Sequence, residues 1–281
     1  MTAVPWKEKE YVITGEDFAN FSKLIYKTCG IHLKERKREL MQVRLSKRLK
    51  ERGIKSFKEY YQLLISKDSG TELVHLINAI ATNLTSFFRE SVHFDYLTEE
   101  IFPKIFAAPR SSLRIRFWSA GCSTGEEPYS LAMTLLKYIK KPVGMDIKIL
   151  GTDISTRVLK KAISGIYSPD RVKIISASDL SRFFDKFKQE TGFYYQVKDS
   201  VRNLITFRQL NLMDPFPFNE VFDVIFCRNV MIYFDRIHQE GLVNKFYRCL
   251  KPGGLLLIGH SESLTGIEQS FEYIKPTIYR K

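Results

Sequence analysis

A glycine-containing loop between a predicted strand and a predicted helix constrains this chain more than any other feature. The strand is expected at residues 114–118, and apolar side chains at helical spacing run from 129 to 136. Between them, Gly121 and Gly125 let the backbone turn tightly and approach a ligand closely. Strand, glycine loop and helix in this order form the beginning of a nucleotide-binding α/β domain.

The end of this loop argues against a ligand that carries phosphate. The loop lacks both the glycine spacing of a dinucleotide-binding loop and the Gly-Lys-Ser/Thr ending of a phosphate-binding loop. It ends in Glu126 and Glu127, which would repel phosphate but can accept hydrogen bonds from ribose or attract a cation. S-adenosylmethionine (SAM) matches, because it has an adenosine, a sulfonium cation and no phosphate. Taken alone, the loop is also compatible with an ordinary tight turn that exposes two acids.

The length and composition fit a folded protein with an acidic partner. The chain has 281 residues, 44% of them hydrophobic, which is enough for one large or two modest domains. Its net charge of +13 indicates binding to nucleic acid, anionic lipid or an acidic protein surface. We expect no membrane-spanning helix and, at residues 1–10, no secretory signal, because long apolar runs are absent. Four cysteines without C-x-x-C spacing favour a reduced cytoplasmic protein without a zinc site.

Residues 1–82 are predicted to form an all-helical N-terminal domain. Within it, a strongly basic helix is expected from 34 to 52. Apolar residues repeat along this helix and predict a buried stripe at Leu33, Met41, Leu45 and Leu49. Arg36, Lys47 and Lys50 fall together on the opposite face. That face is either a docking surface for an acidic partner or a solvated charged face.

Residues 83–281 are predicted to form a Rossmann-like α/β domain. Its second strand, at 146–153, ends in Asp153, and an acid at this position of a doubly wound sheet hydrogen-bonds ribose hydroxyls. The alternative for Asp153 is a cap on the next helix, a role it could also have in addition to binding ribose. A small antiparallel β-subdomain insert is expected at about 183–203. A mostly parallel, seven-stranded sheet, as in SAM-dependent methyltransferases, would be completed by strands at 204–207, 221–227 and 255–259 and a hairpin at 271–280.

Five stretches of the chain match one protein family in order and spacing, over nearly the full length: 82–90, 118–130, 164–167, 225–235 and 250–262. With these stretches the sequence resembles the CheR family, the chemotaxis-receptor protein-glutamate O-methyltransferases. The resemblance implies methyl transfer from SAM to glutamate side chains, which yields glutamate methyl esters and S-adenosyl-L-homocysteine. It also implies a cytoplasmic, monomeric enzyme that holds no metal and is not inserted in the membrane. Its partner would be the acidic helical bundle of methyl-accepting chemotaxis receptors, not nucleic acid.

The resemblance also implies which residues form the site. The family's SAM-binding positions correspond to Asn83, Thr85, Arg89, Glu127, Asp153, Asn211, Leu212, Arg228 and Asn229. Arg89 and Tyr233 are the positions implied for orienting the substrate and for catalysis. A glutamate side chain has an unperturbed pKa of about 4.3 and is ionised at pH 7, so the reaction needs alignment but no general base. His260 is therefore assigned a structural role.

Two surfaces are candidates for receptor docking. The first is the basic face formed by Arg36, Lys47 and Lys50, whose charge complements an acidic helical bundle. The second is the inserted β-subdomain, which in part of the family binds a receptor's C-terminal peptide. In those members the loop of the insert is rich in glycine, whereas residues 189–193 contain one glycine here.

Two other functions stay open. A nucleic-acid methyltransferase would account for the net charge of +13. An amino-methylating enzyme of that class is expected to carry an Asn/Asp-Pro-Pro-Tyr-like loop where this chain has Arg-Asn-Val-Met at 228–231. A cytosine-C5 enzyme needs a nucleophilic cysteine, whereas Cys227 lies on a predicted buried strand. The second alternative is a regulatory module that binds SAM or a receptor without turnover, against which the presence of Arg89 and Tyr233 argues.

Overall fold

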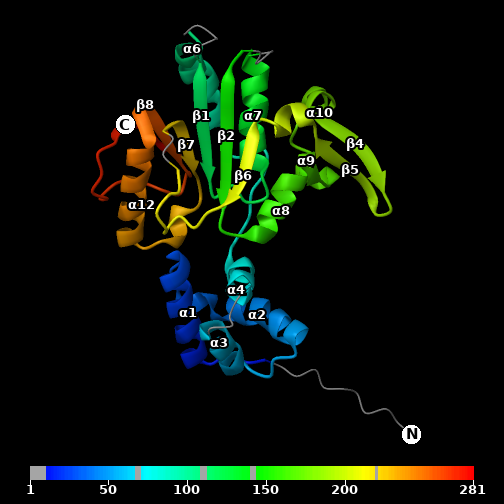
Figure 1. Cartoon of the computed structure of the whole chain (residues 1–281), viewed down its shortest axis with the longest axis vertical. Coiled ribbons are helices and arrows are strands. Elements are labelled where there is room, and N and C mark those ends of the chain that lie inside the picture. The colour runs from blue at the N-terminus through cyan, green and yellow to red at the C-terminus, as the bar shows by residue number, and fades with distance from the viewer. Residues whose placement is uncertain (1–10, 67–70, 108–112, 140–143, 219–220) are drawn as a thin grey trace. The chain divides into compact units, whose positions relative to one another are not determined.

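The computed structural model describes residues 11–66, 71–107, 113–139, 144–218 and 221–281, and it divides into two compact units (Figure 1). One unit ends at Ala81 and the other begins at Thr82. The prediction about a secretory signal concerns residues 1–10, which lie outside the described part of the chain. Among the described helices, none combines the length and the apolar composition that crossing a membrane would require.

The N-terminal unit is all-helical, as the sequence predicts. Its helices are α1 Gly15–Cys29, α2 Arg38–Arg52, α3 Phe57–Ile65 and α4 Glu72–Ile80. At the beginning of α1, the side chains of Thr14 and Asp17 each accept a hydrogen bond from the other residue's backbone, which forms a capping box. Phe21, Leu45 and Tyr60 come from three different helices and are fully buried, so the unit has its own core.

The basic helix begins later than the sequence predicts. Residues Glu35–Lys37 form a separate 3-10 turn, and α2 begins at Arg38 instead of at residue 34. No side chain caps the beginning of α2, and the tighter 3-10 hydrogen bonds satisfy part of the backbone before the α-helical pattern starts. Arg36 therefore lies outside α2, whereas Lys47 and Lys50 lie on it, and all three side chains are exposed.

The second unit is built on the predicted mostly parallel sheet of seven strands (Figure 1). The strands are β1 Arg114–Ala120, β2 Asp146–Asp153, β6 Ile205–Gln209, β7 Phe222–Cys227, β8 Leu250–Ile258, β9 Glu272–Lys275 and β10 Ile278–Arg280. Their order is β6-β2-β1-β7-β8-β10-β9. In this order, the first five strands (β6, β2, β1, β7 and β8) pair in parallel with their neighbours. Strand β10 pairs antiparallel with both β8 and β9. This is a Rossmann-like sheet, because the chain order reverses between β1 and β7.

The sheet buries side chains on both faces. Phe117 of β1 belongs to a cluster with residues of helix α7 (Glu126–Ile139), and Trp118 to a cluster with residues of α12 (Arg236–Cys249). Consecutive side chains on a strand point to opposite faces of the sheet, so β1 contributes side chains to the hydrophobic cluster on each face. The indole N–H of Trp118 donates to the Thr152 hydroxyl at 2.9 Å. Around the indole, at centroid distances from 4.9 to 5.3 Å, lie the rings of Phe216, Phe218, Phe222 and Phe246.

The remaining helices flank the sheet or lead into it. Helices α5 Val92–Tyr96 and α6 Phe102–Ile105 are separated by a π-helical turn at Leu97–Ile101, and helix α8 Thr156–Ser164 follows β2. All of these elements contribute side chains to the cluster that contains Phe117. The linker between the N-terminal unit and α5, residues 82–91, contains the Asn-Leu-Thr-Ser-Phe-Phe-Arg-Glu motif.

The predicted antiparallel insert is a three-stranded sheet with the order β3-β5-β4. Its strands are β3 Ile166–Tyr167, β4 Phe184–Gln189 and β5 Gly192–Val197. The short helices α9 Pro169–Val172, α10 Ala177–Phe183 and α11 Asp199–Arg202 accompany it. The sheet reaches back to Ile166, before the expected start near 183, because a strand of two residues is too short to show an alternating pattern.

We predict that Arg48→Ala destabilises the N-terminal unit by roughly 3 kcal/mol, because the buried acid Glu72 would lose its two-pronged partner and keep only the more distant Arg52, at 3.6 Å, and the Tyr60 hydroxyl, at 3.1 Å, among the described residues. Arg48 donates from Nε and Nη2 to the two carboxylate oxygens of Glu72, at 2.6 and 2.8 Å, and Glu72 is 5% exposed. Urea unfolding at pH 7 measures the effect. Arg38→Ala is the matched control, because Arg38 pairs only with exposed Glu35 and should cost less than about 0.5 kcal/mol.

The same pair predicts a pH dependence. The hydrogen bonds from Arg48 lower the pKa of Glu72, so the pair stabilises the fold above the ordinary glutamate pKa of about 4.5. That stabilisation is lost as the pH falls through the lowered pKa. The difference between wild type and Arg48→Ala should therefore be full at pH 6 to 7 and shrink in strong acid. A difference that does not change with pH would contradict this account.

Candidate functional site

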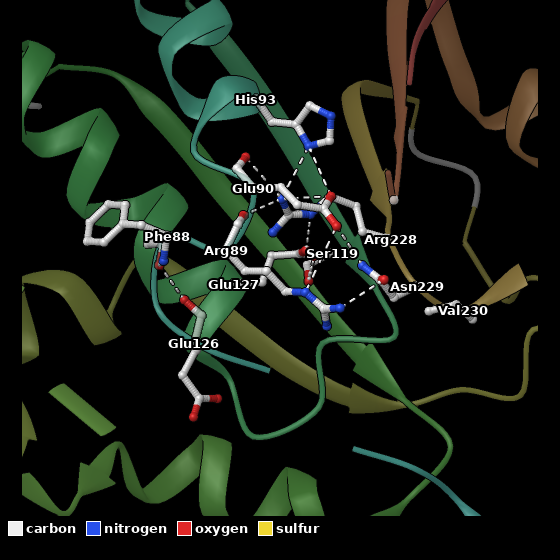
Figure 2. A network of polar contacts seen from close by, with 12 residues as sticks. Phe88, Arg89, Glu90, His93, Ser119, Glu126, Glu127, Arg228, Asn229 and Val230 are labelled. Carbon is white, nitrogen blue, oxygen red and sulfur yellow. Dashed lines mark hydrogen bonds and ion pairs between the residues drawn. The ribbon is translucent and has the colours of Figure 1, made fainter. Parts of the chain in front are cut away.

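The candidate site lies at the carboxyl ends of β1 and β7, where the order of the sheet reverses. In a doubly wound sheet, ligands bind in the crevice at this point. Three segments meet there: the linker and the start of α5 at 83–93, the glycine loop at 121–125, and residues 228–233 after β7. Figure 2 shows side chains of the first and third segments together with Ser119, Glu126 and Glu127, which flank the glycine loop.

The glycine loop is fixed to both neighbouring strands. The backbone N–H groups of Gly121 and Cys122 both donate to the carbonyl of Thr152 in β2, each at 2.8 Å. Gly121 has a φ of +87°, and a Cβ at this position would lie 2.4 Å from a methyl group of Val230. Only glycine therefore allows the loop after β1 to lie against the loop after β7.

The two acids of the loop are buried and point in different directions. Glu126 is fully buried; it accepts a hydrogen bond from the Thr124 hydroxyl at 2.6 Å and pairs with the guanidinium of Arg171 in α9. Glu127 accepts from the Ser119 hydroxyl and from Nε of Arg228, both at 2.6 Å. In Figure 2 the Glu126 carboxylate points away from Arg228. The interpretation of the loop as a plain turn with exposed acids is wrong, because both acids are buried with partners.

Arg228 is the centre of the polar network in Figure 2. Its side chain is 2% exposed, and its guanidinium carbon lies 5.4 and 5.5 Å from the ring centroids of Phe94 and Phe226, which stack on each other. Besides its bond to Glu127, it donates from Nη1 to the carbonyl of Arg89 at 2.5 Å and to Nδ1 of His93 at 3.2 Å. One guanidinium thus ties the end of β7 to the linker and to α7.

Asn229 connects the loop after β7 to two charged residues of the linker. Its side-chain carbonyl accepts from Nη2 of Arg89 at 2.9 Å, and its NH₂ group donates to Glu90 at 3.0 Å. Nη1 of Arg89 donates to the carbonyl of Leu84 at 2.9 Å. The Arg89 side chain is 33% exposed, so its guanidinium is both oriented and reachable by a ligand carboxylate.

Asp153 holds the backbone of two loops. Its carboxylate accepts from the N–H of Ser123 and from the N–H of Ser155, each at 2.9 Å. Burial raises the pKa of Asp153, against the effect of these backbone donors. The alternative that Asp153 caps α8 is wrong, since the residue that caps this helix is Ser155. With the backbone of Ile154 as a third donor, about one of the four lone-pair sites of the carboxylate is left for a ribose hydroxyl.

Asn83 has a buried side-chain donor that a ligand could satisfy. Its carbonyl accepts from the Ser123 hydroxyl at 2.9 Å, whereas its side-chain Nδ2 is buried and finds no hydrogen-bond partner among the described residues. A buried donor without a partner is costly, so an acceptor from a ligand is expected there. The Asn83 amide donor, the Asp153 carboxylate and the glycine loop, which at Gly121 lies close to the loop after β7, together fit an adenosine-containing molecule such as SAM. Thr85, two residues further along the linker, is half-buried.

The other predicted site residues are placed as follows. Asn211 follows β6, and its side chain accepts from the N–H of Met213 at 3.1 Å. Leu212 is buried in the cluster around Trp118. Tyr233 is half-buried and is the last residue of a 3-10 turn, Met231–Tyr233. The structure thus gives each residue a place on a loop at the carboxyl end of a strand, and the contacts of each with SAM stay a prediction.

A cluster of possible metal ligands was not indicated by the sequence. Ligand atoms of Glu90, His93 and His260 lie within 4.8 Å of one another. Burial, then the charge of Arg228, lowers the pKa of His93 to about 3, so this imidazole is neutral. However, Nη1 of Arg228 stands 3.2 Å from His93 Nδ1 and 3.6 Å from Glu90 Oε2. This guanidinium already supplies the positive charge that a metal ion would bring.

Strained backbone gathers at the site. Among the described non-glycine residues, those with a positive φ are Phe88, Glu90, Ser123, Asn229 and Thr277. All except Thr277 belong to the three segments of the site. Such conformations persist only where the surroundings impose them, and they concentrate at functional sites. The sequence indicated neither this strain nor the roles of Glu90 and His93, although the two residues are three positions apart, with Glu90 just before α5 and His93 in its first turn.

We predict that Asp153→Ala weakens SAM binding by roughly 1–3 kcal/mol, the cost of leaving hydrogen-bonding groups without partners. The ribose hydroxyls would lose their acceptor, and the N–H of Ser123 would lose its own. Calorimetric titration with SAM measures the effect, and Asp170→Ala is a control because Asp170 is exposed. Unchanged affinity would remove Asp153 from the site.

Comparison with known proteins agrees with this geometry. Residues 83–280 match the model of the CheR methyltransferase SAM-binding domain, and residues 16–81 match that of the CheR methyltransferase all-alpha domain. A chemotaxis protein methyltransferase of Borreliella burgdorferi is 44% identical over 273 residues, covering 96% of this chain and 95% of the relative. One from Escherichia coli is 40% identical, covering 93% and 89%.

Similarity to solved structures is remote. A SAM-dependent methyltransferase from Mesorhizobium loti is 16% identical, covers 59% of this chain and 54% of its own, and has a TM-score of 0.28. A match this weak adds nothing to the assignment. The family models and the sequence relatives span nearly the whole chain, in the order that the two units have. The chain therefore belongs to the CheR methyltransferase family, and it is a SAM-dependent methyltransferase of chemotaxis.

Proposed function

We propose that this enzyme transfers the methyl group of SAM to glutamate side chains of chemotaxis receptors. The observation that carries the proposal is the position of Arg89. Its guanidinium is held by Asn229 and by the carbonyl of Leu84, yet a third of the side chain is exposed. An oriented and accessible guanidinium beside the candidate SAM site can steer a carboxylate, whether of SAM or of the substrate.

The main requirement of the reaction is that the protein aligns the substrate carboxylate with the methyl group of SAM. Bound SAM supplies an electrophilic methyl group. The substrate carboxylate is ionised at neutral pH, since its unperturbed pKa is about 4.3, so no residue has to remove a proton. The neutral state of His93 and its bonds to Arg228 and Thr277 agree with a structural role for this histidine. Arg89 and Tyr233 would orient the attacking carboxylate, and the buried network would keep them in place.

The cytosine-C5 form of the rival nucleic-acid function is disfavoured by Cys227. This cysteine is fully buried on β7, and burial raises the pKa of its thiol well above the ordinary value. A thiol that is neutral and inaccessible cannot attack a cytosine ring. A regulatory module without turnover is disfavoured in turn by the exposed guanidinium of Arg89, which a purely structural role does not require.

We propose further that the basic face of the N-terminal unit docks the acidic helical bundle of the receptor. Arg36, Lys47 and Lys50 are exposed and belong to the N-terminal unit, whereas the residues of the polar network around Arg228 belong to the second unit. Exposed charges of this kind raise the rate of encounter more than the intrinsic contact energy. Because that bundle is cytoplasmic, we place the enzyme in the cytoplasm, acting as a monomer and without a metal.

The proposal is tested by incubating the enzyme with labelled SAM and either receptor cytoplasmic fragments or RNA. Label that appears on receptor glutamates and is released by base supports the proposal, and activity should survive chelator treatment. Label on RNA would establish the rival function. Binding of SAM without transfer to either substrate would establish the regulatory module.

We expect Tyr233→Phe to leave SAM affinity nearly unchanged and to lower the turnover number. The ring keeps its packing, and only the hydroxyl that would contact the substrate carboxylate is lost. Tyr273→Phe, on an exposed tyrosine of β9, is the matched control. Equal turnover in the two variants would show that the Tyr233 hydroxyl has no catalytic role and that the ring only lines the pocket.

Reversing Arg36, Lys47 and Lys50 to glutamate should raise the KM for the receptor steeply, leave SAM binding unchanged and flatten the dependence of KM on salt. Salt screens such charges over about 8 Å at 0.15 M. A control with the same change in net charge reverses the exposed Lys23, Lys27 and Lys58 of the same unit. If both triple variants keep the wild-type KM, the inserted β-subdomain becomes the docking candidate.

A further inference from the structure

One buried carboxylate organises the loop after β7 without belonging to it. Glu262 is 9% exposed, and its two oxygens accept hydrogen bonds from backbone N–H groups only. Oε2 accepts from Asn229 at 2.8 Å and from Gly259 at 2.6 Å. Oε1 accepts from Val230 at 2.9 Å and from Ile232 at 3.2 Å. A carboxylate has about four lone-pair sites, so these four donors use its capacity.

The backbone that Glu262 binds is held in an unfavourable conformation. Asn229 has a φ of +59°, in the left-handed region that non-glycine residues rarely adopt. The end of β8 comes so close that a Cβ on Gly259 would lie 2.7 Å from the Asn229 nitrogen and 2.9 Å from Glu262 Oε2. A strained conformation lasts only where several contacts impose it. Here the contacts are the hydrogen bonds to Glu262.

The same loop carries side chains of the candidate site. Asn229 orients Arg89 and Glu90 through its amide group. The N–H of Ile232 lies within the 3-10 turn that ends in Tyr233. Fixing the backbone from 229 to 232 therefore fixes where Asn229 and Tyr233 point. Glu262 itself has no free oxygen lone pair to offer a substrate, so its effect on the reaction would be indirect.

We infer that Glu262 is a positioning residue for methyl transfer, which acts by clamping the backbone of residues 229–232 with its two carboxyl oxygens. The consequence for turnover rests on the proposed function, in which Arg89 and Tyr233 orient the substrate. The clamp itself rests on the four hydrogen bonds alone. Glutamine has the same shape as glutamate, but its NH₂ group would face two of the N–H donors, so Glu262→Gln should release half of the clamp.

The test combines amide hydrogen exchange with kinetics on the full-length enzyme. In the wild type without SAM, the amides of Asn229, Val230 and Ile232 should be protected. In Glu262→Gln they should exchange faster, while amides inside β7 stay protected. The turnover number of the folded enzyme on a receptor fragment should fall roughly 10- to 100-fold, as for a small misplacement of reacting groups. The receptor KM should change by less than about threefold, since docking is elsewhere.

Asp223→Asn is the matched control. Asp223 lies at the other end of β7, where its carboxylate accepts from the N–H of Arg116 at 2.8 Å and from Lys251 Nζ at 2.7 Å. This variant should lower the thermal midpoint while keeping the turnover number and the exchange rates of the 229–232 amides. Glu262→Asp keeps the charge on a shorter side chain and should give intermediate values if Glu262→Gln does not fold.

Two results would overturn the inference. Wild-type amides of Asn229, Val230 and Ile232 that exchange as in an unstructured peptide would show that no clamp exists. A Glu262 variant with faster exchange at these amides but a normal turnover number would show that the clamp has no role in catalysis. Failure of the wild type to methylate any receptor would instead overturn the proposed function and leave the exchange result standing.

Discussion

The buried guanidinium of Arg228 is the interaction on which the rest of the site depends. A charge that is 2% exposed is tolerated only when it is paired and hydrogen-bonded. Glu127 supplies the ion pair, the carbonyl of Arg89 and the ring of His93 supply acceptors, and the rings of Phe94 and Phe226 lie beside the guanidinium. These partners come from α7, the linker, α5 and β7 itself. Satisfying one cation therefore ties the end of β7 to the linker, to α5 and to the first turn of α7.

Most carboxylates near the site accept hydrogen bonds from backbone N–H groups or pair with an arginine, instead of acting as general acids or bases. Asp153 binds three backbone N–H groups, Glu262 binds four, and Glu126 and Glu127 bind arginines. This use suits the reaction, because a substrate that is already ionised needs no proton transfer but does need alignment. Rigid loops that place donors before the substrate arrives are a means of alignment. The positive φ angles of Ser123 and Asn229 show that the rigidity opposes local conformational preference.

The chain divides chemistry and charge between its two units. The network around Arg228 lies in the second unit, whereas Arg36, Lys47 and Lys50 lie in the first. The first unit has its own core around Phe21, Leu45 and Tyr60. An independent core lets one unit serve partner recognition while the other keeps the geometry that methyl transfer requires. The net charge of +13 is explained without nucleic acid if the partner is an acidic receptor bundle.

The sequence by itself determined the fold class, the family and the loops that carry the site, because strand, glycine loop and helix follow local patterns and the motifs keep their spacing. Local pattern also placed Asp153 at the end of β2 and Arg228 at the end of β7. Tertiary structure decided the partners. The pairing of Glu126 with Arg171, the enclosure of Arg228 and the clamp by Glu262 join residues about 30 to 140 positions apart. No local pattern encodes such contacts, since they exist only once the sheet brings the ends of its strands together.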